Sequence, residues 1–370
     1  MRVCQLVPSL EAQYGGPSKS VYALSDALAT LGHDVELLAT APANPDTRNT
    51  GTLRIATFQR SRPLALCPSR TLRQYLDNAS PAVVHHHSIW LRTLHYAAQK
   101  SRRDRIPLVI SPRGMLSSWS LRHHSRRKKF ARRFVHPAAF EHAAGWHATS
   151  KEEAADIRRQ GFLQPICIAP NGVDEPGALD RAAATTYWQP VIQPLSPGRI
   201  AVFYSRLHPK KRVAELIELW AKLAPRDWVL LVVGIPETYS VAQLSTYASR
   251  VGAQDRIKIL DGSAVPPPYA VASLFLLPSH SENFGLVIAE AMVHGVPVLV
   301  TDSTPWSAIN DTGAGRCVAW ETYGSELQML LAESPERLRE RGQIARKWVR
   351  QHFAWRQSAI MLGDFYRSLI

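Results

Sequence analysis

The chain has 370 residues, 45% of them hydrophobic, with a formal net charge of +14 and an isoelectric point near 9.9. This length accommodates two domains of ordinary size. No stretch approaches the ~18 uncharged apolar residues that a membrane span needs. Four scattered cysteines without a Cys-x-x-Cys pair indicate neither a zinc site nor a disulfide framework. The first residues form an apolar run too short for a signal peptide, so we expect a cytoplasmic protein with reduced thiols.

The first half of the chain alternates predicted strands with helices. Strands are expected at residues 3–7, 35–39 and 108–110, and a further strand is expected to begin at Val83 and Val84. A helix is expected after the first strand, because its apolar residues share one face: Val21, Leu24, Leu28 and Leu31. Gly32 is expected to end this helix. Before that helix, Gly15 and Gly16 lack a Cβ and let the backbone approach a ligand. An ordinary tight turn is the alternative interpretation of this pair.

The second half repeats the alternation, which predicts parallel sheets with helices on both faces. Strands are expected at 200–204, 229–233, 257–260 and 274–277. One helix is indicated by apolar residues on a single face: Val213, Leu216, Ile217, Trp220 and Leu223. The stretch from Pro170 to Gly198 carries several prolines and is interpreted as a hinge region. The last thirty residues are expected to be helical, with a break near Phe353.

The most informative segment is PSHSENFGLVIAEAMVHGVPVLVT, residues 278–301. It predicts a polar loop after a strand, a helix from about Gly285 to His294, and a further strand at 298–301. Such loops are where parallel sheets bind ligands. Amides at a helix start suit a phosphate, and Glu282 and Glu290 could hold the groups on either side of a diphosphate. The alternative is a capped surface helix with two solvated carboxylates.

This segment closely resembles the Glu-x7-Glu signature of glycosyltransferase family 4, which contains retaining enzymes of the GT-B fold. The resemblance covers nearly the whole chain, because four motifs occur in family order: the Gly-Gly loop, the Asn-Gly-Val-Asp junction, the Arg-Leu-x-x-x-Lys loop and the Glu-x7-Glu segment. It implies an α/β protein with two Rossmann-like, doubly wound domains facing a cleft. Residues 1–170 would form the acceptor-side domain and 171–350 the nucleotide-sugar domain, with a helix at 351–370 crossing back to the first.

The resemblance also assigns roles to residues of the Glu-x7-Glu segment. It implies that Glu282 lies near the donor sugar and that Glu290 binds the ribose. The diphosphate would be held by the backbone between them, at Asn283, Phe284, Gly285 and Leu286.

A basic loop follows the strand at 200–204. The family places an Arg and a Lys five residues apart here, which implies that Arg206 and Lys211 stabilise the leaving nucleoside diphosphate. Losing one such contact typically costs ~3 kcal/mol of transition-state stabilisation. A basic surface loop is the alternative, and Lys210 and Arg212 are expected to be solvated. Because the chain has no Asp-x-Asp motif, we expect no metal and no other cofactor.

Two further features concern the first half. His85, His86 and His87 are consecutive, so neighbouring rings point to opposite faces of a strand and the three cannot converge on one ion. His87 is expected to face the cleft, or all three are structural. Many family members place a His after the strand at 108–110, whereas this chain has Arg113. Arg113 would serve near the donor sugar or an acidic acceptor, and it cannot act as a base.

Positive charge is concentrated between residues 122 and 133, where no acidic residue occurs. The basic residues are Arg122, Arg126, Arg127, Lys128, Lys129, Arg132 and Arg133. Each gains about 1 kcal/mol near anionic lipid, so we expect peripheral binding to the inner face of the cell membrane or an acceptor patch. A solvated charged helix is the alternative.

These observations predict a retaining enzyme that moves a hexose-type sugar from a nucleoside-diphosphate sugar to a hydroxyl of a glycan or lipid-linked acceptor. The resemblance is strongest to bacterial enzymes of envelope polysaccharide and lipopolysaccharide synthesis. A nucleotide-sugar epimerase is the alternative within the GT-B fold. A nucleic-acid-binding protein is a remote alternative, because the chain lacks an interleaved stripe of aromatic and basic residues.

Overall fold

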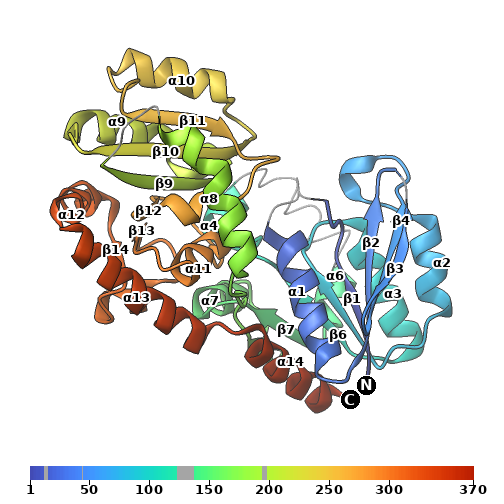
Figure 1. Cartoon of the computed structure of the whole chain (residues 1–370). Helices are drawn as coiled ribbons and strands as arrows, with labels where there is room; N and C mark the ends of the chain where they lie inside the picture. The colour runs from blue at the N-terminus through green and yellow to red at the C-terminus, as the bar shows by residue number, and fades with distance from the viewer. Residues whose placement is uncertain (12–15, 44, 123–136, 194–197) are drawn as a thin grey trace. The chain divides into compact units, whose positions relative to one another are not determined.

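The computed structural model describes residues 1–11, 16–43, 45–122, 137–193 and 198–370. The chain divides into two compact units (Figure 1). Unit 1 contains Met1–Gly172 together with Phe353–Ile370, and unit 2 contains Val173–His352.

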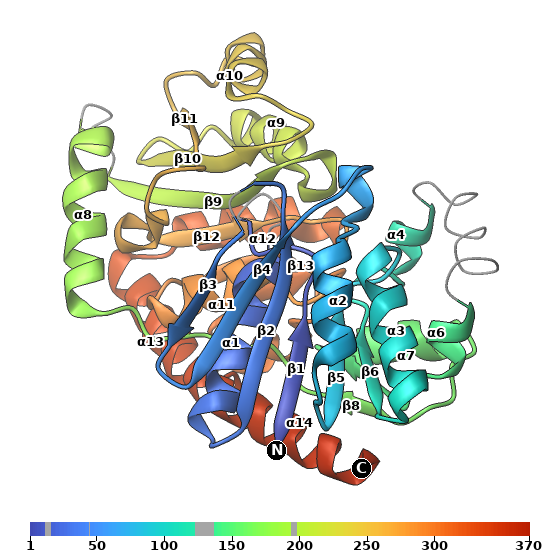
Figure 2. The same ribbon diagram turned by 90° about the vertical axis from the view of Figure 1, so that its right-hand side faces the viewer.

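Unit 1 is built on an eight-stranded sheet with the order β3-β4-β2-β1-β5-β6-β7-β8. Its strands are β1 (Arg2–Leu6), β2 (Asp34–Ala41), β3 (Thr47–Thr50), β4 (Leu53–Gln59), β5 (Val83–His87), β6 (Leu108–Ser111), β7 (Gly145–Ala148) and β8 (Ile166–Ile168). Neighbouring strands pair in parallel except β3 and β4. Figure 2 shows β2, β1 and β5 side by side.

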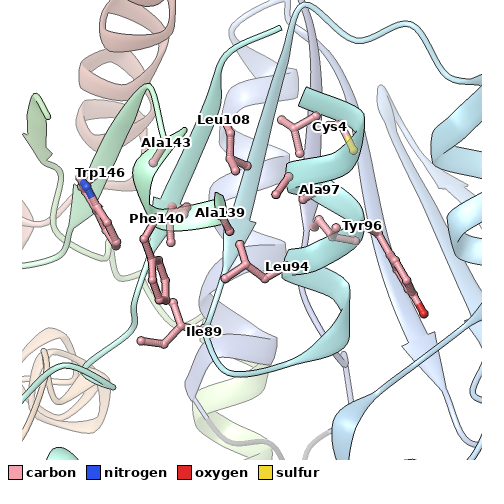
Figure 3. Packing of buried hydrophobic residues seen from close by; sticks show 14 of the residues in the cluster. Cys4, Ile89, Leu94, Tyr96, Ala97, Leu108, Ala139, Phe140, Ala143 and Trp146 are labelled. Atoms are coloured by element: carbon pink, nitrogen blue, oxygen red, sulfur yellow. The ribbon is translucent and has the colours of Figure 1, made fainter. Parts of the chain in front are cut away.

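Helices cover both faces of this sheet. They are α1 (Gly16–Thr30), α2 (Arg70–Asn78), α3 (Arg92–Asp104), α4 (Ser118–Arg122), α6 (Pro137–Glu141), α7 (Lys151–Arg159) and α14 (Trp355–Leu369). On one face, Leu94 of α3 packs in the same apolar cluster as Leu108 and Trp146 (Figure 3). On the other, Val109 packs in a cluster with residues of α1 and α14, including Tyr366. Leu108 and Val109 lie in different clusters because successive strand residues face opposite sides.

The C-terminal helix α14 belongs to unit 1, where it lies beside α1 (Figure 1). It begins after a break at Phe353 and Ala354, which confirms the predicted interruption. Gly172 passes so close to its first turn that an added Cβ would lie 2.4 Å from the backbone nitrogen of Trp355. Only glycine permits this approach.

Unit 2 has a six-stranded sheet with the order β11-β10-β9-β12-β13-β14, parallel throughout. The strands are β9 (Arg199–Leu207), β10 (Trp228–Pro236), β11 (Ile257–Asp261), β12 (Leu274–Leu277), β13 (Val298–Thr301) and β14 (Gly315–Val318). The helices are α8 (Ala178–Ile192), α9 (Val213–Leu223), α10 (Val241–Arg250), α11 (Leu286–Val293), α12 (Trp320–Ala332) and α13 (Pro335–His352).

The two sheets, parallel apart from the β3–β4 pair, confirm the predicted fold class of two Rossmann-like α/β units. The predicted strands of both halves are present, and β13 and α11 match closely. Five strands were not predicted: β3, β4, β7, β8 and β14. The proline-rich segment interpreted as a hinge contains the 15-residue helix α8, with Pro190 near its end.

Candidate functional site

The loop between β12 and α11 holds the first carboxylate of the Glu-x7-Glu segment in a buried network. Oε1 of Glu282 accepts a hydrogen bond from the Ser279 hydroxyl at 2.6 Å and lies 2.5 Å from Nζ of Lys211. The side chains of Lys211 and Glu282 are 8% and 9% exposed. The carbonyl of Ser279 accepts hydrogen bonds from the hydroxyls of Thr301 and Ser303 beside the end of β13. Two strand ends and the β9–α9 loop therefore fix this carboxylate.

Glu282 is ionised despite its burial. Burial alone raises the pKa of its carboxyl group, but the charges of Lys211 and Lys210 outweigh this effect, and the pKa is lowered from its usual value. Each member of the ion pair therefore stabilises the charge of the other, although both side chains are buried.

The backbone after Glu282 has a fixed turn that leads into α11. Gly285 has a φ of +77°, and an added Cβ would lie 2.8 Å from Cδ1 of Ile288. Phe284 is buried against Trp306, whose indole nitrogen donates to the carbonyl of Phe284. Asn283 is half-buried. The amide groups at the start of α11, from Leu286 onward, are therefore presented at the end of a short polar loop.

The second carboxylate of the segment lies within α11 and is held by a buried tyrosine. The hydroxyl of Tyr269 donates to Oε2 of Glu290 at 2.8 Å. Burial raises the pKa of Tyr269, and the charge of Glu290 adds to the effect, so the phenol remains a neutral donor. Sequence reasoning missed Tyr269, which lies 21 residues away in a segment without a motif.

The two predicted cations of the β9–α9 loop have different surroundings. Lys211 pairs with Glu282, whereas Arg206 is partly exposed and donates to Glu237 at 3.0 Å. The expectation that Lys210 and Arg212 are solvated is wrong. Lys210 is partly buried, and its pKa is lowered to about 8 by burial, with Glu282 opposing and Lys211 and Arg206 reinforcing the shift. The guanidinium of Arg212 lies over the ring of Trp320, with its Cζ 4.5 Å from the ring centroid.

The glycine pair and the basic run of unit 1 are only partly described by the structure. Gly16 is exposed and begins α1, and Arg122 is exposed at the end of α4. The other residues of the pair and the run lie outside the described residues: Gly15, Arg126, Arg127, Lys128, Lys129, Arg132 and Arg133.

His87 and Arg113 lie together at the carboxyl ends of β5 and β6. Nε and Nη2 of Arg113 lie 3.2 and 2.9 Å from Nδ1 of His87, which must therefore carry the lone pair. Nε2 of His87 then donates to Oε1 of Gln5 at 2.6 Å. Nη1 of Arg113 donates to Asn171 at 2.8 Å. His87 is fully buried, and burial, His85 and Arg113 hold its pKa well below the usual value.

The three consecutive histidines separate as the strand period predicts. His86 contacts Thr93, whereas His85 and His87 share the opposite face with His147 of β7. Ligand atoms of His85, His87 and His147 lie within 4.8 Å of one another, a grouping that sequence spacing did not indicate. Both ring nitrogens of His87 already have partners, one of them cationic Arg113. This donor set fits a buried hydrogen-bond network better than a resident cation.

Two family models match the chain and together account for most of it. "Glycosyltransferase Family 4" matches residues 14–175, and "Glycosyl transferases group 1" matches residues 189–348.

Among the described residues, no helix is long and apolar enough to cross a membrane.

The sequence is similar to D-inositol 3-phosphate glycosyltransferase of Segniliparus rotundus, with 30% identity over 243 residues, or 60% of this chain and 52% of that protein. The chain spans about half the length of the curated relatives it matches. Its fold is similar to sucrose-phosphate synthase of Thermosynechococcus elongatus, with a TM-score of 0.77 and 21% identity over 100% and 99% of the two chains. Anabaena HepE in complex with UDP-glucose gives a TM-score of 0.76 and 18% identity, with both chains fully covered.

Proposed function

Because this chain belongs to glycosyltransferase family 4 and has the GT-B fold, we propose that it is a retaining glycosyltransferase. It moves a hexose-type sugar from a nucleoside diphosphate to a hydroxyl of a glycan or lipid-linked acceptor, in bacterial envelope polysaccharide synthesis. The observation that carries the proposal is the Lys211–Glu282 pair directly before the start of α11. HepE, a structural neighbour, is described in complex with UDP-glucose, which supports a nucleotide-sugar donor.

The donor is held by unit 2 in this proposal. Backbone amides from Asn283 to Leu286 bind the diphosphate at the start of α11, where helix amides favour an anion. Glu290, held by Tyr269, accepts hydrogen bonds from the ribose hydroxyls. Glu282 contacts the donor sugar, and Ser279 and Lys211 hold its carboxylate in place.

Cationic side chains stabilise the negative charge that develops on the leaving diphosphate. An ammonium has three N–H donors, and the contact of Lys211 with Glu282 uses one of them. The charges of Arg206 and Lys211 both contribute to lowering the pKa of Lys210, so three cations are gathered at this loop. Preorganised positive charge of this kind stabilises a departing diphosphate. We therefore propose that catalysis needs no metal ion.

Retention follows if the acceptor attacks on the face from which the diphosphate departs. The bond between the anomeric carbon and the phosphate oxygen breaks, and the acceptor oxygen bonds to the same carbon. The acceptor's proton passes to the departing phosphate oxygen, so no side chain need act as the base. Arg113 lies where the family resemblance leads us to expect a histidine, and its guanidinium remains protonated.

Two alanine variants test the site. Glu290→Ala should weaken nucleotide binding in calorimetry, because ribose contacts form before reaction. Glu282→Ala should mainly lower turnover, because contacts with the sugar change during reaction. Unchanged kinetics in both variants would reject the site.

Product analysis tests the reaction itself. NMR of the product should show the anomeric configuration of the donor. Incubation without an acceptor separates transfer from the epimerase alternative, since an epimerase releases an isomerised sugar without any acceptor.

A further inference from the structure

Arg113 is a buried cation that has no anionic partner among the described residues. It is 8% exposed, and its hydrogen-bond acceptors are the neutral groups of His87 and Asn171. No carboxylate in the described part of the chain forms an ion pair with it. Glu153, whose charge raises the pKa of Arg113, is engaged elsewhere: its oxygens accept from Gly114 N and from Thr149. Burying a charge without a counter-ion is strongly unfavourable.

The guanidinium has donors that remain available. It carries five N–H groups, and its contacts with His87 and Asn171 use three of them. One N–H on Nη1 and one on Nη2 are left over. Two such N–H groups on the two terminal nitrogens match the two oxygens of a carboxylate or phosphate.

The turn that carries Arg113 is fixed from both sides. The residue has a φ of +52°, an uncommon conformation for a non-glycine residue. The amide of Gly114 donates to Glu153 at 2.7 Å, which anchors the turn to α7. Burial lowers the pKa of Arg113 to about 10, so the side chain stays charged at neutral pH. The guanidinium is therefore held in one orientation before any ligand arrives.

The neighbouring turn adds further donors without partners. Ser88 follows β5 and donates its amide to the carbonyl of Ser111 at 2.8 Å, which joins the two turns. Ser88 and Trp90 both have positive φ values. In the described structure, the Ser111 hydroxyl and the Trp90 indole nitrogen are buried and have no hydrogen-bond partner. Both turns lie at the carboxyl ends of parallel strands, the usual position of a ligand.

We propose that Arg113 is the anion-binding residue of the acceptor site, so that the acceptor is an acidic sugar carrying a phosphate or carboxylate group. His87 and Asn171 act as positioning residues for its guanidinium. The inference rests on the proposed function, because it names the chemistry of the molecule that receives the sugar.

Calorimetry with three matched sugars tests the inference. The intact protein is first saturated with whichever of UDP, GDP and ADP gives the largest thermal shift, so that the donor phosphate site is occupied. Glucose, glucose 6-phosphate and glucuronate are then compared. An anionic sugar should bind more tightly than glucose. Arg113→Gln should reduce that binding at least about tenfold, the effect of losing a hydrogen-bonded charge. The affinity of Arg113→Lys for the anionic sugar should lie between those of the wild type and Arg113→Gln. Lysine keeps the charge but lacks the paired N–H donors of the guanidinium.

Arg103→Gln is the matched control. Arg103 also lies in unit 1 but is exposed and paired with Asp77 and Asp104, so its loss should leave sugar binding unchanged. The phosphate and carboxylate arms show which anion is preferred. Equal binding of the three sugars to the wild type, or equal binding of the anionic sugars to wild type and Arg113→Gln, overturns the inference.

Two further readouts separate other outcomes. Nucleotide binding is measured on each variant, since failure of the proposed function would appear as absence of nucleotide binding in the wild type. Thermal unfolding without ligand is also measured. A purely structural Arg113 predicts that Arg113→Gln unfolds at a clearly lower temperature with anion binding intact, a result that contradicts the inference. If Arg113 binds an anion as inferred, Arg113→Gln removes an uncompensated buried charge and should lose little stability.

Discussion

Nζ of Lys211 lies 2.5 Å from Oε1 of Glu282, and both side chains are more than nine-tenths buried. This pair joins the loop after β9 to the loop after β12, 71 residues further along the chain. It holds the carboxylate of Glu282, which is proposed to contact the donor sugar. The same lysine is also proposed to face the leaving diphosphate.

The pair should be sensitive to the loss of either partner. Lys211→Met or Glu282→Gln should each lower the free energy of unfolding by about 3 kcal/mol, because an uncompensated polar or charged group then stays buried. The double variant should lose less than the sum of the two. Urea denaturation measures all three. Arg206→Gln is the control: its pair with Glu237 is partly exposed, and its loss should cost under about 1 kcal/mol.

Tyr269 should act on the nucleotide through Glu290. Tyr269→Phe removes the 2.8 Å hydrogen bond to the Glu290 carboxylate and should weaken nucleotide binding by about 1 kcal/mol, or roughly fivefold. Calorimetry with the nucleoside diphosphate measures the change. Tyr323→Phe is the matched control, since its buried hydroxyl donates to the carbonyl of Leu299 instead. Equal effects in both variants would indicate a general loss of stability.

Donor affinity should depend on pH through Lys210. Burial lowers the pKa of its ammonium to about 8, against the pull of Glu282. The positive charge is therefore lost as the pH rises through about 8, and diphosphate affinity should fall. Lys210→Gln should have lower affinity at neutral pH and a flatter profile between about pH 7 and 9. A profile that keeps its slope in this variant assigns the titration to another group.

The lowered pKa of Lys210 also determines how the free energy of unfolding changes with pH. Because the folded-state pKa lies below the unfolded value of about 10.4, the charged form of Lys210 opposes folding fully below pH 8. That penalty is progressively relieved as the pH rises from about 8 toward 10. The stability of Lys210→Gln relative to the wild type should therefore be greatest below pH 8.

The sequence predicted the regular parts of the site better than its supporting contacts. The apolar runs of β12, β13 and α11 carry strong periodic signals, so the loop with Glu282 was placed correctly between them. Tyr269 and Ser279 were not identified, because their roles depend on contacts that no local spacing encodes. Lys210 was interpreted as solvated because four cations in eight residues are typical of a surface loop. The fold instead buries Lys211 and partly buries Lys210 beside Glu282.

Three of the strands that were not predicted, β3, β8 and β14, lie at the edges of their sheets. β5 was predicted to begin at Val83 and Val84, and its three histidines were correctly interpreted as strand residues. His85 and Tyr366 stabilise each other through a 2.6 Å hydrogen bond across 281 residues, a contact invisible to periodicity. β3 is a four-residue polar edge strand with every residue exposed. Helix α8 was obscured by Pro190, although its Ala-rich first part favours a helix.

Activity should survive chelation of metal ions. The proposed site has Arg206, Lys210 and Lys211 where a divalent cation would otherwise neutralise the diphosphate. Turnover measured after dialysis against EDTA should equal that of untreated enzyme. Complete loss in EDTA that magnesium or manganese restores would show that a metal ion contributes to the reaction. Elemental analysis of the untreated protein provides a second readout and also tests the group of His85, His87 and His147.

The basic run from Arg122 to Arg133 should bind anionic membranes. Vesicles containing anionic lipid should retain the protein at low salt and release it as salt rises, because the screening length falls to about 3 Å at 1 M. A variant with Gln at Arg126, Arg127, Lys128 and Lys129 should lose vesicle binding. Its nucleotide-sugar affinity should persist, because the proposed donor residues belong to unit 2. Normal vesicle binding with lost activity on a water-soluble acceptor would instead place these residues in an acceptor pocket.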